Sequence, residues 1–231
     1  MRVTLSCVVL AGVLATVSGV AEAQYFFDNF DSYAAGSLIA GQGGWETWGG
    51  NPGANTLVVN TFSASPPNSL GLSGTADIVH QFAGVNTGVW YLKAKFYIPS
   101  SQLGDLYFIA LNRYDGACAA AGDCDWSMQV RMTASDGQVV SEGGSSNPSS
   151  ASPLPLLTNQ WAEIVAEINF TANTYSVYYN GALLDTLPWF VTGDLNLAAI
   201  NLFSNGSTES YGDDVWLDTT IPVELQRFTV D

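Results

Sequence analysis

Apolar and polar residues alternate with a period of two through much of the chain after residue 24. The clearest case is GVWYLKAKFYIPS (88–100), in which one face is apolar and the other carries lysine and tyrosine. The apolar face consists of Trp90, Leu92, Ala94, Phe96 and Ile98. The opposite face consists of Tyr91, Lys93, Lys95 and Tyr97. Because side chains alternate between the two faces of a strand, this pattern predicts a half-buried antiparallel strand.

Two further segments extend the same pattern. GDLYFIALNRYDG (104–116) is almost uniformly apolar and predicts a central strand, whereas DWSMQVRMTASDG (125–137) alternates. The alternation predicts four inward side chains, Trp126, Met128, Val130 and Met132. It predicts four outward ones, Ser127, Gln129, Arg131 and Thr133. Because no long run after residue 24 has the spacing of an amphipathic helix, we expect an all-β, antiparallel two-sheet sandwich.

The segment WAEIVAEINFTANTYSVYYNGALLDTLPW (161–189) places Glu163 and Glu167 on the polar face of a predicted strand. Residues four apart on a strand are separated by about 13 Å, from a rise of about 3.3 Å per residue. Glycosidases need their two carboxyl groups about 5–9.5 Å apart. The pair is therefore predicted to face solvent rather than to act in catalysis. Asn180-Gly181 predicts a type I′ hairpin, because that turn requires positive φ at both positions.

The first residues have the pattern of a secretory leader. Arg2 precedes a long apolar run, and Ala21-Glu22-Ala23 fits a cleavage site with small residues. We expect a signal peptide over 1–23 and a secreted or cell-surface protein, with a membrane anchor as the alternative. The rest is predicted to form one domain over 24–220 and a C-terminal tail over 221–231, because about 208 residues suit a single β-sandwich.

The net charge of the chain disfavours some classes of binding partner. The chain has 21 acidic and 6 basic residues, with a net charge of −15 and a single histidine. This charge repels nucleic acid and anionic membranes. The apolar content of 47% argues against disorder. The sequence does not determine the oligomeric state.

Two cysteines remain after the leader, in the segment CAAAGDC. Cys118 and Cys124 are expected to form a local disulfide in an exported protein. A metal site there is disfavoured, because His80 lies far away in the sequence. A loop this short gives a stabilisation of about 2 kcal/mol.

Several motifs together resemble the laminin-G-like group of concanavalin A-like jelly rolls, in its secreted bacterial members. The central motif is a tryptophan that opens a strand, followed by a YNG hairpin; it comprises Trp161, Tyr178, Tyr179, Asn180 and Gly181. The segments 26–48 and 211–218 are similar to the first and closing strands of such domains, which lie beside each other. The resemblance implies a jelly roll over most of 26–218. It implies little about activity, because the fold hosts lectins, hydrolases, lyases and adhesion modules.

The catalytic motifs of enzymes with this fold are missing. The glucanase motif E-x-D-x-x-E is absent, since Val165 stands between the two glutamates. The lyase motif Q-I-H and the arginine-rich strand are also absent. His80 and Gln81 are neighbours on a predicted strand and point to opposite faces, so they cannot share a groove. His80 is expected to be a half-buried strand residue.

Basic residues concentrate on three predicted strands and suggest a binding groove. Lys93 and Lys95 share a face with tyrosines, and Arg131 shares one with Gln129. If these faces form one surface, lysine and arginine would pair with the carboxylate or sulfate groups of an acidic polysaccharide. The alternative is that these cations only solubilise the outer faces. The predicted ligand-binding residues are Tyr91, Lys93, Lys95, Tyr97, Arg113, Gln129 and Arg131.

Loop aromatics and acidic residues give two further candidates. Trp45, Trp48 and the pair Trp189-Phe190 could be sugar platforms, although Trp45 is expected to plug the edge of the core. Calcium is the other candidate, because members of the resembling group often hold one where the first and last strands meet. Asp28 and Asp214 are the predicted ligands of this structural ion. Solvated acids are the alternative.

The sequence thus favours a secreted, non-catalytic jelly-roll domain that binds glycans or mediates surface contacts. One alternative is a polysaccharide lyase or glycoside hydrolase with a non-standard active site, whose candidate residues are Lys93, Arg131, Tyr97 and His80. The other is a structural adhesion module without a sugar groove. The identity of a ligand is not determined by these patterns.

Overall fold

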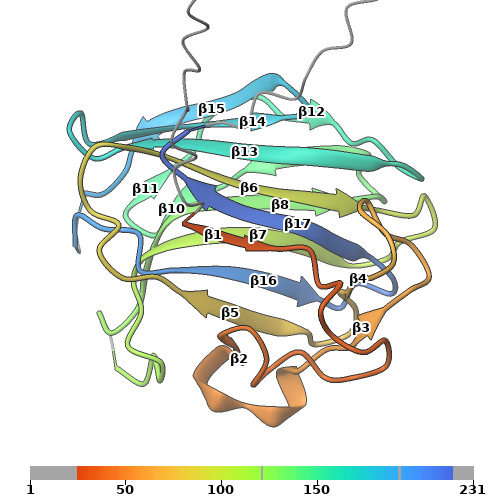
Figure 1. Cartoon of the computed structure of the whole chain (residues 1–231). Coiled ribbons are helices and arrows are strands. Elements are labelled where there is room, and N and C mark those ends of the chain that lie inside the picture. The colour runs from red at the N-terminus through yellow and green to blue at the C-terminus, as the bar shows by residue number, and fades with distance from the viewer. Residues whose placement is uncertain (1–24, 121, 192–193, 221–231) are drawn as a thin grey trace, which may run out of the picture.

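The computed structural model describes residues 25–120, 122–191 and 194–220. The predicted leader and tail lie outside the described residues. The described chain is almost entirely β, and its two helical segments are single 3-10 turns at Trp48–Gly50 and Pro52–Ala54. Within these ranges no helix has the length and hydropathy needed to cross a bilayer. Two large antiparallel sheets pack face to face, as the sequence predicted (Figure 1).

We call the eight-stranded layer sheet I. Its strands pair in the order β15-β14-β13-β6-β17-β4-β3, and β1 also pairs with β17. Their bounds are β15 (Ala182–Pro188), β14 (Thr174–Tyr179), β13 (Trp161–Asn169), β6 (Val89–Tyr97), β17 (Tyr211–Asp218), β4 (Ser69–Gly71), β3 (Val58–Val59) and β1 (Phe26–Asp28).

We call the seven-stranded layer sheet II. Its strands pair in the order β12-β9-β8-β7-β16-β5-β2. Their bounds are β12 (Leu154–Pro155), β9 (Gln138–Ser141), β8 (Asp125–Thr133), β7 (Asp105–Arg113), β16 (Ala199–Asn205), β5 (Asp77–Gln81) and β2 (Trp45–Thr47). A separate two-stranded ribbon is formed by β10 (Gly143–Gly144) and β11 (Asn147–Pro148).

The core lies between the sheets and is supplied by the alternation of each strand. On β6, Leu92, Ala94 and Phe96 point inward, and on β13 Ile164 and Ile168 do so. Each large apolar side chain removed from water in this way contributes about 1.5–3 kcal/mol. Glu163 and Glu167 therefore lie on the outer face of sheet I, as predicted.

Two local predictions are confirmed by the backbone. Asn180 and Gly181 have φ values of 46° and 80°, and they join β14 to β15 as the expected hairpin. The closing strand β17 pairs with the first strand β1, with Asp28 opposite Val215. This pairing brings the two ends of the domain together in the middle of sheet I.

The prediction for the start of β8 is wrong. Trp126 points outward and is 37% exposed, while Ser127 is buried. The register between β7 and β8 shifts near Leu111, so Trp126 and Met128 oppose Leu111 and Ala110. A β-bulge adds one residue to a strand and reverses the faces of the residues on one side of it. Gln129 and Arg131, which follow the bulge, point outward as predicted.

Candidate functional site

The outer face of sheet II carries an apolar cluster that is separate from the core. It consists of Val79, Ile109, Leu111, Tyr114 and Ala199. Trp48, Tyr107 and Phe203 pack against it, and the rings of Tyr107 and Phe203 stack with centroids 5.5 Å apart. The outer face of sheet II therefore carries a cluster of apolar and aromatic side chains, and the same strands carry polar side chains further along.

Trp126 lines three depressions. The first, of about 380 Å³, is lined by residues that include Arg113, Cys124 and Trp126. The second, of about 200 Å³, is lined by Trp48, Asp77, Ile109, Trp126, Gln129, Asn201 and Phe203. The third holds only about 10 Å³ and lies between Trp126, Ser127 and Trp189, among others. Trp126 is therefore a lining residue of all three depressions.

Two loops border this region. The 3-10 turn at Trp48 contacts Tyr114, with ring centroids 5.2 Å apart. The loop after β7 is closed by the disulfide between Cys118 and Cys124, which confirms the predicted pairing. Both cysteines pack against the outer apolar cluster. The disulfide therefore fixes one border of the first depression.

Arg113 anchors the same border. Its Nε and Nη2 donate to the two carboxylate oxygens of Asp194 at 2.9 and 3.2 Å. Its Nη1 donates to the carbonyl oxygen of Gly122 at 2.8 Å, inside the disulfide loop. The guanidinium thus joins the loop to the segment before β16. The guanidinium of Arg113 lowers the pKa of Asp194, because its hydrogen bond favours the charged form of the carboxyl group.

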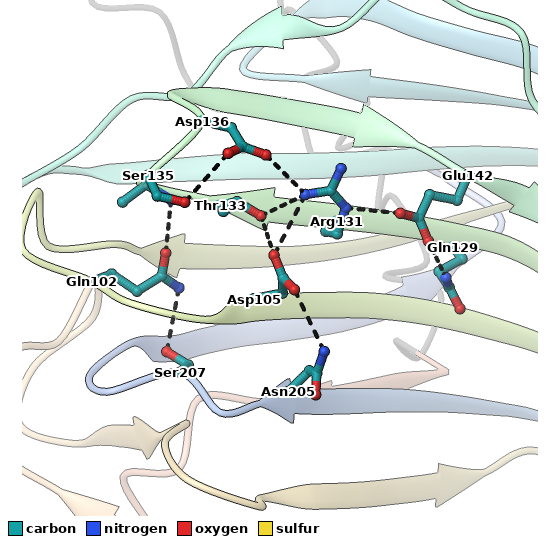
Figure 2. A network of polar contacts seen from close by, with 11 residues as sticks. Gln102, Asp105, Gln129, Arg131, Thr133, Ser135, Asp136, Glu142, Asn205 and Ser207 are labelled. Atoms are coloured by element: carbon teal, nitrogen blue, oxygen red, sulfur yellow. Dashed lines mark hydrogen bonds and ion pairs between the residues drawn. The ribbon is translucent and has the colours of Figure 1, made fainter.

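Arg131 forms a second, denser network, which Figure 2 shows. Its Nε donates to Glu142 at 2.8 Å, and its Nη1 lies 3.4 Å from both Asp105 and Asp136. Nη1 also donates to Thr133 at 2.8 Å. Gln129 donates from its amide to the other oxygen of Glu142. One guanidinium is therefore shared by three carboxylates, and the cluster carries a net negative charge.

Tyr107 lies beside this network. Burial raises the pKa of its phenol to about 12, and the negative charges of Glu142 and Asp105 add to the effect. The phenol therefore stays protonated at neutral pH. A neutral Tyr107 suits packing and hydrogen bonding, and it is poorly suited to act as a base.

The structure divides the seven predicted ligand-binding residues between two sheets. Arg113, Gln129 and Arg131 lie on sheet II. The other four, on β6, lie on the outer face of sheet I: Tyr91, Lys93, Lys95 and Tyr97. The two groups face opposite sides of the sandwich, so the single basic groove expected from the sequence does not form.

The lysines of sheet I are also paired. Lys93 lies 3.0 Å from Glu163, and its Nζ is 5.9 Å from the centre of the Trp216 ring. Lys95 lies 3.0 Å from Asp214. All four lysine and arginine side chains in the described ranges thus have carboxylate partners. These four side chains therefore do not form a cluster of unpaired cations that could bind an anionic ligand.

The predicted calcium ligands have other partners in the described structure. Asp28 accepts hydrogen bonds from Tyr33 at 2.6 Å, from the indole of Trp45 at 2.9 Å and from the amide of Phe30 at 2.8 Å. Asp214 is paired with Lys95. Among the described residues, the grouping with metal-ligand spacing is Asp115 with the two disulfide cysteines, whose sulfurs are already bonded. Calcium at Asp28 and Asp214 stays a prediction.

Other sequence candidates occupy structural positions. Trp45 is 1% exposed and plugs the core edge as expected, and Trp189 is fully buried, so it cannot be a platform. His80 is half-buried on β5, where its ring packs 4.1 Å from that of Phe26. Burial lowers the pKa of His80. The residues suggested for a lyase therefore do not converge, because Lys93 and Tyr97 lie on sheet I and His80 and Arg131 on sheet II.

Sequence reasoning missed the residues at the centre of the candidate site. Trp126 was assigned to the core because the bulge is not visible in the alternation. Tyr107 and Phe203 belong to strands that are apolar on both faces, so no period-two pattern marks their outer side. Gly144, which lies against the backbone of Trp126 and Ser127 at the start of β8, could have hinted at close backbone contact there.

No protein-family model matches the chain, and no curated sequence is significantly similar to it. Solved structures do match. An endo-β-1,4-glucuronan lyase from the fungus Trichoderma reesei superposes with a TM-score of 0.58 at 11% identity, over 85% of this chain and 96% of the lyase. A cellulose induced protein, Cip1, superposes with a TM-score of 0.52 at 16% identity, over 84% of this chain and 97% of that protein.

A sialidase superposes with a TM-score of 0.57 at 11% identity, over 85% of this chain but only 18% of the sialidase. Likeness at such low identity concerns the fold and not the activity. Assignment to the concanavalin A-like group itself stays a resemblance. The chain has the jelly-roll-like, two-sheet β-sandwich fold that these structures share.

Proposed function

We propose that this chain is a glycan-binding protein and that the outer face of sheet II is its binding surface. One observation carries the proposal: Trp126 is 37% exposed near the start of β8, where it lines three depressions. An exposed indole offers a flat apolar face together with a polar N–H group. Such groups suit sugar rings, which have apolar faces and hydroxyl edges.

The surroundings of Trp126 support this function. Ile109 and Phe203 supply apolar contacts in the second depression, and Gln129, Asn201 and Asp77 supply polar atoms. A few polar groups among apolar side chains are typical of small-molecule sites. The structures with similar folds include proteins whose names refer to glucuronan, to cellulose and to sialic acid chemistry, which agrees with a carbohydrate ligand.

Binding without catalysis is favoured by the electrostatics of this face. A lyase needs a base and a cation near a uronate carboxylate, but Tyr107 stays protonated and Arg131 is held by three carboxylates. A hydrolase needs one acidic and one ionised carboxyl group that reach the same bond. The carboxylates beside Arg131 are engaged in ion pairs instead. An adhesion module remains the alternative if no glycan binds.

The proposal also includes export of the protein from the cell and a bound structural calcium ion. The leader pattern of residues 1–23 and the disulfide at Cys118 support export to an oxidising compartment. Calcium at Asp28 and Asp214 is supported by hard oxygen ligands near the meeting of β1 and β17. A lower midpoint of thermal unfolding in the presence of a chelator would support bound calcium, and an unchanged midpoint would contradict it.

The test compares two tryptophan variants of the purified protein on a glycan array and by affinity electrophoresis. Trp126→Ala should lose binding by about tenfold or more, which corresponds to about 1.4 kcal/mol. Trp161→Ala is the matched control, because Trp161 is a partly exposed strand residue on the outer face of sheet I. Equal losses in both variants, or binding that survives Trp126→Ala, would refute this surface.

The same samples are assayed for reducing ends and for unsaturated products at the absorbance of the new double bond. Release of product by the unmodified protein would replace the binding proposal with an enzymatic one. Absence of both binding and product would leave the adhesion module.

A further inference from the structure

Acidic residues dominate the outer face of sheet II. Seven carboxylates lie on it or at its border: Glu46, Asp77, Asp105, Asp125, Asp136, Glu142 and Asp194. The guanidinium groups of Arg113 and Arg131 are the cations there within the described residues. The face is therefore strongly negative, on a chain whose net charge is already −15.

The two guanidinium groups are committed to partners inside the protein. Arg113 makes a bidentate contact with Asp194 and a third hydrogen bond to Gly122. Arg131 bonds to Glu142 and Thr133 and lies within ion-pair distance of Asp105 and Asp136. A uronate or sulfate group of a ligand would have to compete with these fixed carboxylates for either arginine. It would also approach the remaining negative charges.

The groups next to Trp126 suit hydroxyl groups instead. Gln129 is half-buried, points outward and lines the depression of about 200 Å³ together with the indole. A side-chain amide both donates and accepts hydrogen bonds, so it can meet a sugar hydroxyl or a bridging water. Carboxylates such as Asp125, which lines the first depression, accept hydrogen bonds from hydroxyl donors, and an anionic ligand lacks such donors at its charged positions.

We infer that the ligand of this site is an uncharged glycan and that the carboxylates exclude anionic polysaccharides. This inference rests on the proposed binding function and narrows its ligand class. It reverses the expectation drawn from the basic residues, because each of those residues is neutralised within the fold. The carboxylates of this face repel each charged sugar of an anionic polysaccharide, so the total repulsion increases with the number of charged sugars. Salt weakens this repulsion.

The test measures binding of the whole protein to soluble neutral hexose polymers and to polyuronates, at low salt and at 0.5 M sodium chloride. We expect binding to at least one neutral polymer that changes by less than about twofold with salt, and at least about tenfold weaker binding to polyuronates at low salt. Stronger binding to polyuronates than to neutral polymers would overturn the inference while leaving the proposed function in place. Failure of every polymer to bind would overturn both.

A pair of charge variants makes the test specific to this face. Asp136→Asn with Glu142→Gln removes two of the three carboxylates around Arg131, so polyuronate binding should rise by about tenfold at low salt. Glu167→Gln with Asp218→Asn removes the same charge from the outer face of sheet I, where both residues oppose Tyr91. An equal rise in both double variants would show a general charge effect and refute exclusion at sheet II.

Discussion

The carboxyl group of Asp213 should make the stability of the fold depend on pH in an unusual direction. Asp213 lies on β17, where the register against β6 shifts, and it is fully buried. Its carboxyl oxygens accept hydrogen bonds from the amides of Ala64 at 2.7 Å, Ser65 at 3.1 Å and Asp214 at 2.8 Å. Burial raises the pKa of Asp213 to about 7, against the lowering effect of the Ser65 amide.

The sign follows from the protons bound in each state. In the unfolded chain the carboxyl group has its ordinary pKa of 3.8, so between that pH and about 7 only the folded state holds the proton. Folding is therefore favoured at the acidic end of this window, and stability falls as pH rises through it. At 1.36 kcal/mol per pKa unit the loss is at most about 4 kcal/mol. The three amide donors favour the carboxylate, and the pKa of about 7 already includes their effect.

The assay is urea unfolding of the unmodified protein and of Asp213→Asn from pH 4 to pH 8. The variant cannot ionise, so the difference between the two stability curves removes the contribution of the other carboxylates. We expect the unmodified protein to lose about 2–4 kcal/mol more than the variant across this range. Asp218→Asn, on the same strand but partly exposed, is the control and should follow the unmodified curve. Parallel curves for the unmodified protein and Asp213→Asn would refute the reasoning.

Three further changes test other parts of the structure. Trp45→Phe removes the indole hydrogen bond to the buried carboxylate of Asp28 and should cost about 1.5–3 kcal/mol in urea unfolding; a loss under 0.5 kcal/mol would contradict a stabilising bond. Arg131→Met leaves three carboxylates without their cation and should cost about 1–2 kcal/mol, less in high salt, and a salt-independent cost would point to lost packing. Replacing Cys118 and Cys124 by serine should lower stability by about 2 kcal/mol and leave the far-ultraviolet circular dichroism unchanged, whereas a changed spectrum would show that the disulfide is needed for the fold.

Much of the sandwich could be predicted because it depends on residues that are close together in the sequence. The alternation on β6 and β13 assigns each side chain to a face, and burial of the apolar face then fixes which side meets the core. Asn180-Gly181 specifies its turn through backbone sterics alone. The short separation of Cys118 and Cys124 made their disulfide predictable for the same reason.

The candidate site depended on long-range pairing. Which strands share a sheet is decided by contacts between distant segments, so the sequence could not show that Lys93 and Arg131 lie on opposite sides of the sandwich. It also could not show that Asp105 and Glu142 neutralise Arg131, because these residues come from different segments that meet only in the fold.

The sequence by itself thus determined the β class, the faces of the regular strands, the hairpin and the local disulfide. The tertiary structure decided that Trp126 is exposed, because a bulge set by pairing with β7 reverses its face. It also decided that the basic residues are neutralised, since ion pairs depend on distances in space rather than on spacing along the chain.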